Sequence, residues 1–184
     1  GWDSRDKGTN NFADVFGEPS QIIDREKVLF VILNNSNIYE GISPESWDLL
    51  SKVFSTSNGL GGQYSENSKF EMKRFPKEKR NSKLTFVFAH KTPFHPQSSH
   101  VMGEDSQKVA DQAEQLVKLI EEKKVDGLFS GDLHFFARFN SPSGSVKITT
   151  IGAVASERNF QGPRFAALTV WDDYSWEVED VEIR

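Results

Sequence analysis

The sequence predicts an α/β fold: a mixed sheet with helices on its outer face, followed by an antiparallel meander at the C-terminal end. Two observations support this prediction. Up to Ser130, apolar runs of strand length alternate with segments of helical periodicity. Beyond Gly131, four short strand patterns follow one another with turns and no helix between them. The length of 184 residues suits one domain with a sizeable core.

The composition limits the classes of partner. With 36% hydrophobic and 27% charged residues, the chain is typical of a soluble globular protein. No apolar run approaches the roughly 20 residues of a membrane helix, so we expect no membrane partner. The net charge of −5 argues against nucleic-acid binding, and the absence of cysteine excludes disulfides and thiolate metal sites. An anionic substrate would therefore need a local cation, which a bound metal could supply.

The first elements follow a polar, turn-rich segment over residues 1–20, which we interpret as a loop. Val28–Leu33 is a continuous apolar run, typical of a strand covered on both faces. Ser43 and Pro44 then predict a helix start, with Ser43 as N-cap and Pro44 in the first turn. Apolar residues follow at helical spacing: Trp47, Leu50 and Phe54.

Residues 56–82 are rich in Ser, Asn and Gly and become basic from Lys69 to Arg80. The basic side chains could contact phosphate or nucleic acid. A solvent-exposed excursion is the favoured interpretation, because acidic residues are interspersed among them, namely Glu66, Glu71 and Glu78. Loops of this length often mark an insertion near a functional site.

The middle of the chain contains the clearest helix signal. Leu84–Ala89 is a second buried type of strand, and residues 91–104 form a loop after it. From Ser106 to Lys124 the apolar residues fall on one helical face: Val109, Ala113, Leu116, Val117 and Ile120. Val125–Ser130 is the third short apolar strand.

The C-terminal part has the pattern of an antiparallel meander. Ser141–Gly144 and Asp172–Ser175 have the composition of turns. They separate predicted strands at Phe135–Asn140, Val146–Ile151, Arg164–Trp171 and Trp176–Ile183.

Two of the four histidines stand where α/β proteins place chemistry, at the carboxyl ends of strands. His90 follows one buried strand, and His134 closely follows another in Ser130-Gly-Asp-Leu-His134. We expect Gly131 to allow a sharp turn that lets Asp132 and His134 point to the same side. With His90 they would form a ligand set for Zn, Mn or Fe. A histidine at a strand end is often only a hydrogen-bonded structural residue, so the pattern leaves both interpretations open.

The other two histidines, His95 and His100, lie in the polar loop 91–104. For each, a surface role is favoured over contact with a substrate.

Several segments resemble the calcineurin-like metallophosphoesterases. Phe86–Pro93 is similar to the family's strand that ends in a metal-binding His followed by Pro. Val125–His134 is similar to its Gly-His-x-His motif after a strand. Further resemblances lie in the same order along the chain, at Phe16–Pro19, Trp47–Leu50, Ile148–Ala153 and Gly162–Val170. The order and spacing of these segments carry the resemblance over nearly the whole chain.

This resemblance implies that residues 1–184 are the C-terminal half of a four-layer α/β/β/α sandwich. The full-length protein would hold two divalent ions (Mn, Fe or Zn) and hydrolyse a small-molecule phosphomonoester or phosphodiester. His90 and Asp132 would serve one metal and His134 the other. His95 and His100 are the candidates for substrate binding. The catalytic histidine is expected upstream of this fragment, which we expect to be inactive alone.

Two departures from the family leave alternatives open. The family's Asp-x-His, Gly-Asp-x-x-x-Asp and Gly-Asn-His motifs lie earlier in its sequences, and none of them occurs here ahead of His90; in addition, Asp132 stands where the family has His. The chain could therefore be a non-catalytic binding module on a degenerate phosphoesterase fold, or an α/β domain of another class. In an isolated half, the sheet would expose an apolar face, through which we expect self-association. The sequence selects neither the substrate nor the cellular compartment.

Overall fold

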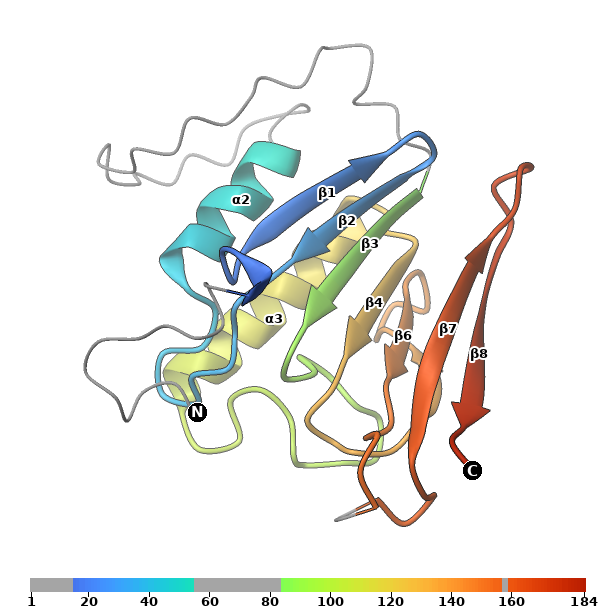
Figure 1. The fold of residues 1–184 in the computed structure, drawn as a ribbon. Helices are drawn as coiled ribbons and strands as arrows, with labels where there is room; N and C mark the ends of the chain where they lie inside the picture. The colour runs from blue at the N-terminus through green and yellow to red at the C-terminus, as the bar shows by residue number, and fades with distance from the viewer. Residues whose placement is uncertain (1–14, 55–83, 157–158) are drawn as a thin grey trace.

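The computed structural model describes residues 15–54, 84–156 and 159–184. A six-stranded sheet, in the order β1-β2-β3-β4-β6-β5, lies beside a two-stranded sheet of β7 and β8 (Figure 1). The elements are β1 Gln21–Arg25, β2 Val28–Ile32, α2 Pro44–Phe54, β3 Leu84–Ala89, α3 Gln107–Glu122, β4 Gly127–Ser130, β5 Ala137–Asn140, β6 Lys147–Thr150, β7 Arg164–Val170 and β8 Trp176–Glu182. A mixed α/β architecture is thereby confirmed. The predicted loop 56–82 lies outside the described residues, as does most of the segment 1–20.

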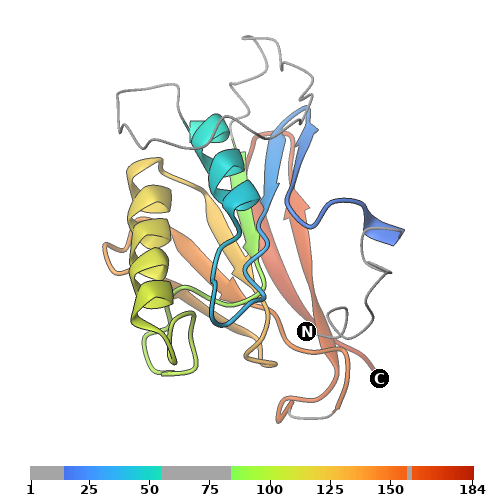
Figure 2. The ribbon, with the colours of Figure 1, turned by 90° about the vertical axis from the view of Figure 1, so that its left-hand side faces the viewer.

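The centre of the large sheet is parallel, and its edges are antiparallel. Strands β2, β3, β4 and β6 run the same way, whereas β1 and β5 pair antiparallel with their neighbours. The carboxyl ends of the four parallel strands therefore meet at one edge of the sheet. Helix α3 connects β3 to β4, and it lies with α2 on one face, while the β7–β8 hairpin lies on the other (Figure 2).

The predicted C-terminal meander is only partly correct. Strands β5 and β6 do pair antiparallel, but β6 also joins β4 as a parallel neighbour. Strands β7 and β8 form a separate antiparallel sheet. Strand β1 was not predicted, because Gln21–Arg25 has only two apolar residues and pairs along its whole length with β2. Local patterns indicate that a segment is a strand, but they do not specify its partner or direction.

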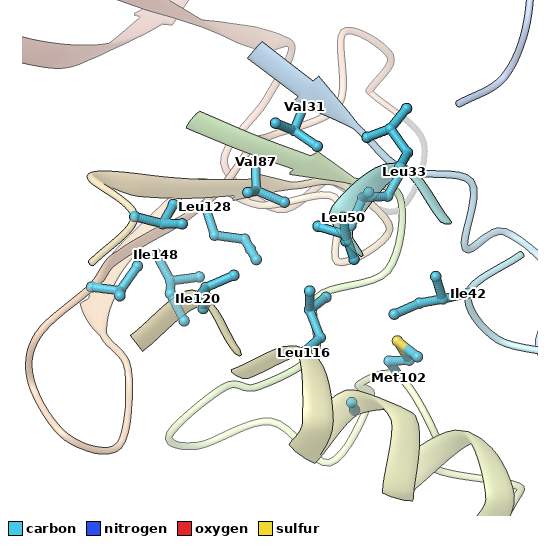
Figure 3. Packing of buried hydrophobic residues seen from close by; sticks show 14 of the residues in the cluster. Val31, Leu33, Ile42, Leu50, Val87, Met102, Leu116, Ile120, Leu128 and Ile148 are labelled. Atoms are coloured by element: carbon cyan, nitrogen blue, oxygen red, sulfur yellow. The ribbon is translucent and has the colours of Figure 1, made fainter. Parts of the chain in front are cut away.

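An aliphatic core fills the space between the sheet and the two helices. Val31, Val87, Leu128 and Ile148 project from neighbouring strands and are each fully buried. They pack with buried residues of α2, α3 and the adjoining loops, including Leu50, Leu116, Ile120, Ile42 and Met102 (Figure 3). Each fully buried aliphatic side chain contributes about 1.5–3 kcal/mol.

An aromatic core fills the space between the sheet and the β7–β8 hairpin. Phe86 is fully buried, and its ring lies 5.0 Å from that of Trp176, edge to face. Phe88 and Phe129 stack with centroids 5.0 Å apart, and Val178 of β8 completes the buried cluster. Because successive side chains of a strand point to opposite faces, one strand supplies both cores. The hairpin thus covers part of the second face of the large sheet, over β3 and β4. Self-association through an exposed sheet face stays a prediction.

Two local features fix the helices and the loop before α3. The Ser43 hydroxyl accepts a hydrogen bond of 3.2 Å from the backbone N–H of Ser46, which confirms Ser43 as the N-cap of α2. Gly103 has a φ of +92°, and a Cβ placed there would lie 2.3 Å from the backbone nitrogen of Ala110. This glycine therefore lets the loop 91–104 lie directly on the first turns of α3. None of the helices in the described ranges is both long and apolar enough to cross a membrane.

Candidate functional site

Polar residues gather where three of the parallel strands end. Asn34 and Asn35 closely follow β2, His90 and Lys91 follow β3, and the turn Gly131–His134 follows β4. These strands are neighbours in the sheet and run in the same direction, so their loops meet at its carboxyl edge. Open α/β sheets bind ligands at this edge.

Asn35 fixes the backbone on which two of the site residues stand. Its side chain is fully buried, and its Oδ1 accepts hydrogen bonds from the backbone N–H groups of His90 (2.6 Å) and Lys91 (3.2 Å). Its Nδ2 donates to the carbonyl oxygen of Lys91 at 2.8 Å. A buried amide with three such partners holds the end of β3 in one conformation.

The turn after β4 contains backbone strain. Asp132 and His134 have φ values of +64° and +63°, a region that residues with a Cβ rarely adopt. We expected Gly131 to make the sharp turn, whereas the two side-chain-bearing residues adopt the left-handed conformation. The N–H of Gly131 donates to the carbonyl of His90 at 2.9 Å, and that of Leu133 donates back to Gly131 at 2.7 Å. The first bond joins the turn to the end of β3, and the second closes the turn itself.

Five side chains form an ionic group, which we call the Asp132 cluster: Asp132, His90, Lys91, His100 and Glu104. One carboxylate oxygen of Asp132 lies 3.6 Å from Nε2 of His90. The other lies 3.5 Å from Nζ of Lys91 and 3.3 Å from Nε2 of His100. Glu104 closes a ring, because its carboxylate lies 3.3 Å from Nζ of Lys91 and 2.7 Å from Nδ1 of His100.

The two carboxylates of the cluster share their partners. Both ring nitrogens of His100 face carboxylate oxygens, one of Glu104 and one of Asp132. The hydrogen bond from His100, assisted by one from Lys91, lowers the pKa of the Glu104 carboxyl from its ordinary value. Both carboxylates are in contact with the ammonium of Lys91.

His134 lies at the other end of the turn; it is half-buried, and its Nδ1 is inaccessible. Within the described ranges, neither its Nδ1 nor the hydroxyl of Ser130 has a hydrogen-bond partner. A buried polar atom without a partner is costly, and such atoms often face a ligand or a water molecule. The structure does not bring His134 into the Asp132 cluster.

His95 has contacts within its own loop and with two phenylalanines. Its Nδ1 accepts hydrogen bonds from the backbone N–H groups of Gln97 (3.1 Å) and Ser98 (2.8 Å). Its ring lies edge-on to Phe139, with centroids 4.7 Å apart, and to Phe135. Burial lowers its pKa from the ordinary value, which favours the neutral ring that these bonds require. His95 thus orders the loop, and its contact with a substrate stays a prediction.

The residues present fit the implied metal site only in part. Two ligands about 2.1 Å from a tetrahedral ion lie about 3.4 Å apart, and His90 Nε2 and Asp132 Oδ1 are 3.6 Å apart. This pair could therefore hold one ion between them, and the unpartnered nitrogen of His134 is suited to another. However, no group of three or more ligating side chains among the described residues is arranged so that it could hold a metal ion. Within the described ranges, His90 and Asp132 would therefore supply only two ligands to such an ion.

Three members of the site were not predicted from the sequence: Asn35, Lys91 and Glu104. Each had a signal, although a weak one. Asn35 follows a buried strand, Lys91 adjoins a candidate ligand, and Glu104 stands four residues after His100. Their contacts depend on how the loop 91–104 folds back over the sheet edge, which the local sequence does not specify.

Comparison with known proteins adds no assignment: no protein-family model matches the chain, and a search of curated proteins finds no significant match.

Proposed function

We propose that the chain is part of a metal-dependent phosphoesterase and that the His90–Asp132 pair contributes to its metal site. The observation that supports this most is the 3.6 Å approach of His90 Nε2 to Asp132 Oδ1 at the carboxyl edge of the parallel strands. An imidazole and a carboxylate from neighbouring strand ends suit a divalent ion such as Mn²⁺ or Zn²⁺. The segment order that resembles the metallophosphoesterases supports the same assignment.

In this proposal the described residues bind and orient. His90 and Asp132 hold one ion, Asn35 keeps His90 in place through its backbone, and His134 offers a nitrogen to a second ion. When bound, such ions activate water and stabilise negative charge on the phosphoryl oxygens. His100 lies at the exposed side of the cluster, half of its side chain being accessible, so a phosphoester could approach it from solvent. The remaining ligands and the catalytic histidine would come from sequence upstream of Gly1.

The proposal is tested by assaying the full-length natural gene product for Mn²⁺-dependent hydrolysis of bis(p-nitrophenyl) phosphate and p-nitrophenyl phosphate. Replacing a ligand removes charge stabilisation that matters most in the transition state, so His90→Ala and Asp132→Ala should each lower kcat/KM by about 100-fold or more. Lys118→Met, on the exposed side of α3, is the matched control and should leave the rate unchanged. Ligand variants with the activity of the control would contradict the proposal.

A second function is favoured by a specific observation. Lys91 already forms an ion pair with Asp132, so this position could be a relic of a metal site in a non-catalytic binding module. The coding sequence upstream of Gly1 separates the two functions. Intact Asp-x-His and Gly-Asn-His motifs there would support the enzyme, and eroded motifs would support the module.

A further inference from the structure

Lys91 is the most unusual charged residue of the site. Its side chain is only 7% exposed, although lysine is rarely buried unless it is paired. Burial removes it from contact with a substrate. Its ammonium lies 3.5 Å from Asp132 and 3.3 Å from Glu104, between the two carboxylates of the cluster.

The backbone gives Lys91 little freedom to leave this position. Asn35 binds both its N–H and its carbonyl group, at 3.2 Å and 2.8 Å. The carbonyl of Thr92, the next residue, accepts from the N–H of Met102 at 2.8 Å, which ties the start of the loop to its end. The backbone of Lys91 is therefore fixed, and its ammonium is held by the two carboxylates that it contacts.

We propose that the Lys91 ammonium is the resident counter-ion of Asp132 and limits the affinity of the His90–Asp132 pair for a divalent ion. This inference rests on the proposed function, since it concerns the same metal site. A divalent ion bound to Asp132 Oδ1 would lie close to an ammonium that already binds Oδ2 of the same carboxylate. Two cations at such a separation repel strongly in a partly buried site. Lys91 is thus a positioning residue that keeps Asp132 neutralised while the metal is absent.

The test measures Mn²⁺ binding to the full chain by titration calorimetry, with MnCl₂ as the only ligand. Lys91→Met removes the ammonium and should tighten Mn²⁺ binding by at least about tenfold, which corresponds to about 1.4 kcal/mol. Lys91→Gln removes the charge but keeps a donor for the two carboxylates, so it provides the same measurement if the Met variant fails to fold. Lys118→Met changes an exposed lysine of α3 and should bind as the wild type does.

The outcomes separate this inference from the proposed function. Tighter binding in the Lys91 variants supports it, because a purely structural role of Lys91 would weaken the site when the residue is lost. Equal or weaker Mn²⁺ binding in folded Lys91 variants overturns the inference and leaves the metal site in place. No Mn²⁺ binding by the wild type or by any variant, in the chain and in the full-length protein, overturns the metal site itself and the inference with it.

Discussion

The two faces of the large sheet are covered in different ways. One face packs an aliphatic core against α2 and α3, and most of its central side chains are fully inaccessible. The other packs an aromatic core against β7 and β8, and many of its members, including Trp176, are only partly buried. The helices follow their strands directly in the chain, whereas the hairpin arrives from the C-terminal end. The difference suggests that the helix-covered face stabilises the fold and that the hairpin is a separately attached cover.

The helix-covered face should respond most to loss of volume. Leu116→Ala on α3 removes a fully buried side chain from the middle of the aliphatic core. We expect the free energy of unfolding to fall by about 2–5 kcal/mol, because the transfer of the lost atoms and the cavity both contribute. Urea denaturation followed by circular dichroism measures this change. Leu119→Ala changes a partly buried leucine of the same helix and should lower the free energy of unfolding by less than half as much. Equal decreases for the two variants would show that the fully buried residues do not contribute more than the partly buried ones.

The β7–β8 hairpin should unfold locally while the six-stranded sheet stays folded. Strands β7 and β8 pair only with each other, while β3 and β4 have neighbours on both sides. We therefore expect the amides of β7 and β8 to exchange hydrogen faster than those of β3 and β4. Val178→Ala removes two buried methyl groups, whose burial stabilises the hairpin by about 1.5 kcal/mol. Amide exchange should therefore become about tenfold faster in the hairpin alone. Exchange that accelerates equally in both sheets would show that they unfold together.

The sequence predicted the helices that cover one face of the sheet, but it predicted an exposed apolar face on the other side, where the structure places the β7–β8 hairpin. The continuous apolar run Val28–Leu33 indicated a strand buried on both faces, and the structure confirms this. Helical periodicity located both helices, because i, i+3 and i+4 spacing is a local property. The place of β6 between β4 and β5 and the separate hairpin could not be predicted, since strand pairing depends on contacts between distant residues.

The candidate site was also predictable only in its local features, namely the residues that stand at the ends of strands. His90 and Asp132 stand at adjacent strand ends, so their proximity followed from the parallel sheet alone. The side chains that surround Asp132 did not follow, because they depend on the path of the loop 91–104. That path is determined by the close approach of Gly103 to α3 and by the side chain of Asn35, neither of which has a periodic signal.

The smallest effect is expected where the hairpin is attached at its tip. Lys27, in the β1–β2 turn, forms an exposed ion pair with Asp172, in the β7–β8 turn. The hydrogen bond from Lys27 lowers the pKa of Asp172 below its ordinary value of 3.8, and the same bond raises the pKa of Lys27 above 10.5. The pair therefore stabilises the fold at neutral pH. Its contribution is lost as the pH falls through the lowered pKa of Asp172, or rises through the raised pKa of Lys27.

Asp172→Asn should lower the melting temperature by no more than about 2 °C at pH 7, because exposed ion pairs contribute little and salt screens them. The difference from the wild type should vanish at a pH below the pKa of Asp172 and in 1 M NaCl. Differential scanning calorimetry at both pH values measures it, and Glu179→Gln on β8 controls for a change of net charge. A loss as large as that of Leu116→Ala would mean that the tip contact anchors the hairpin, and that the aromatic face is not its main attachment.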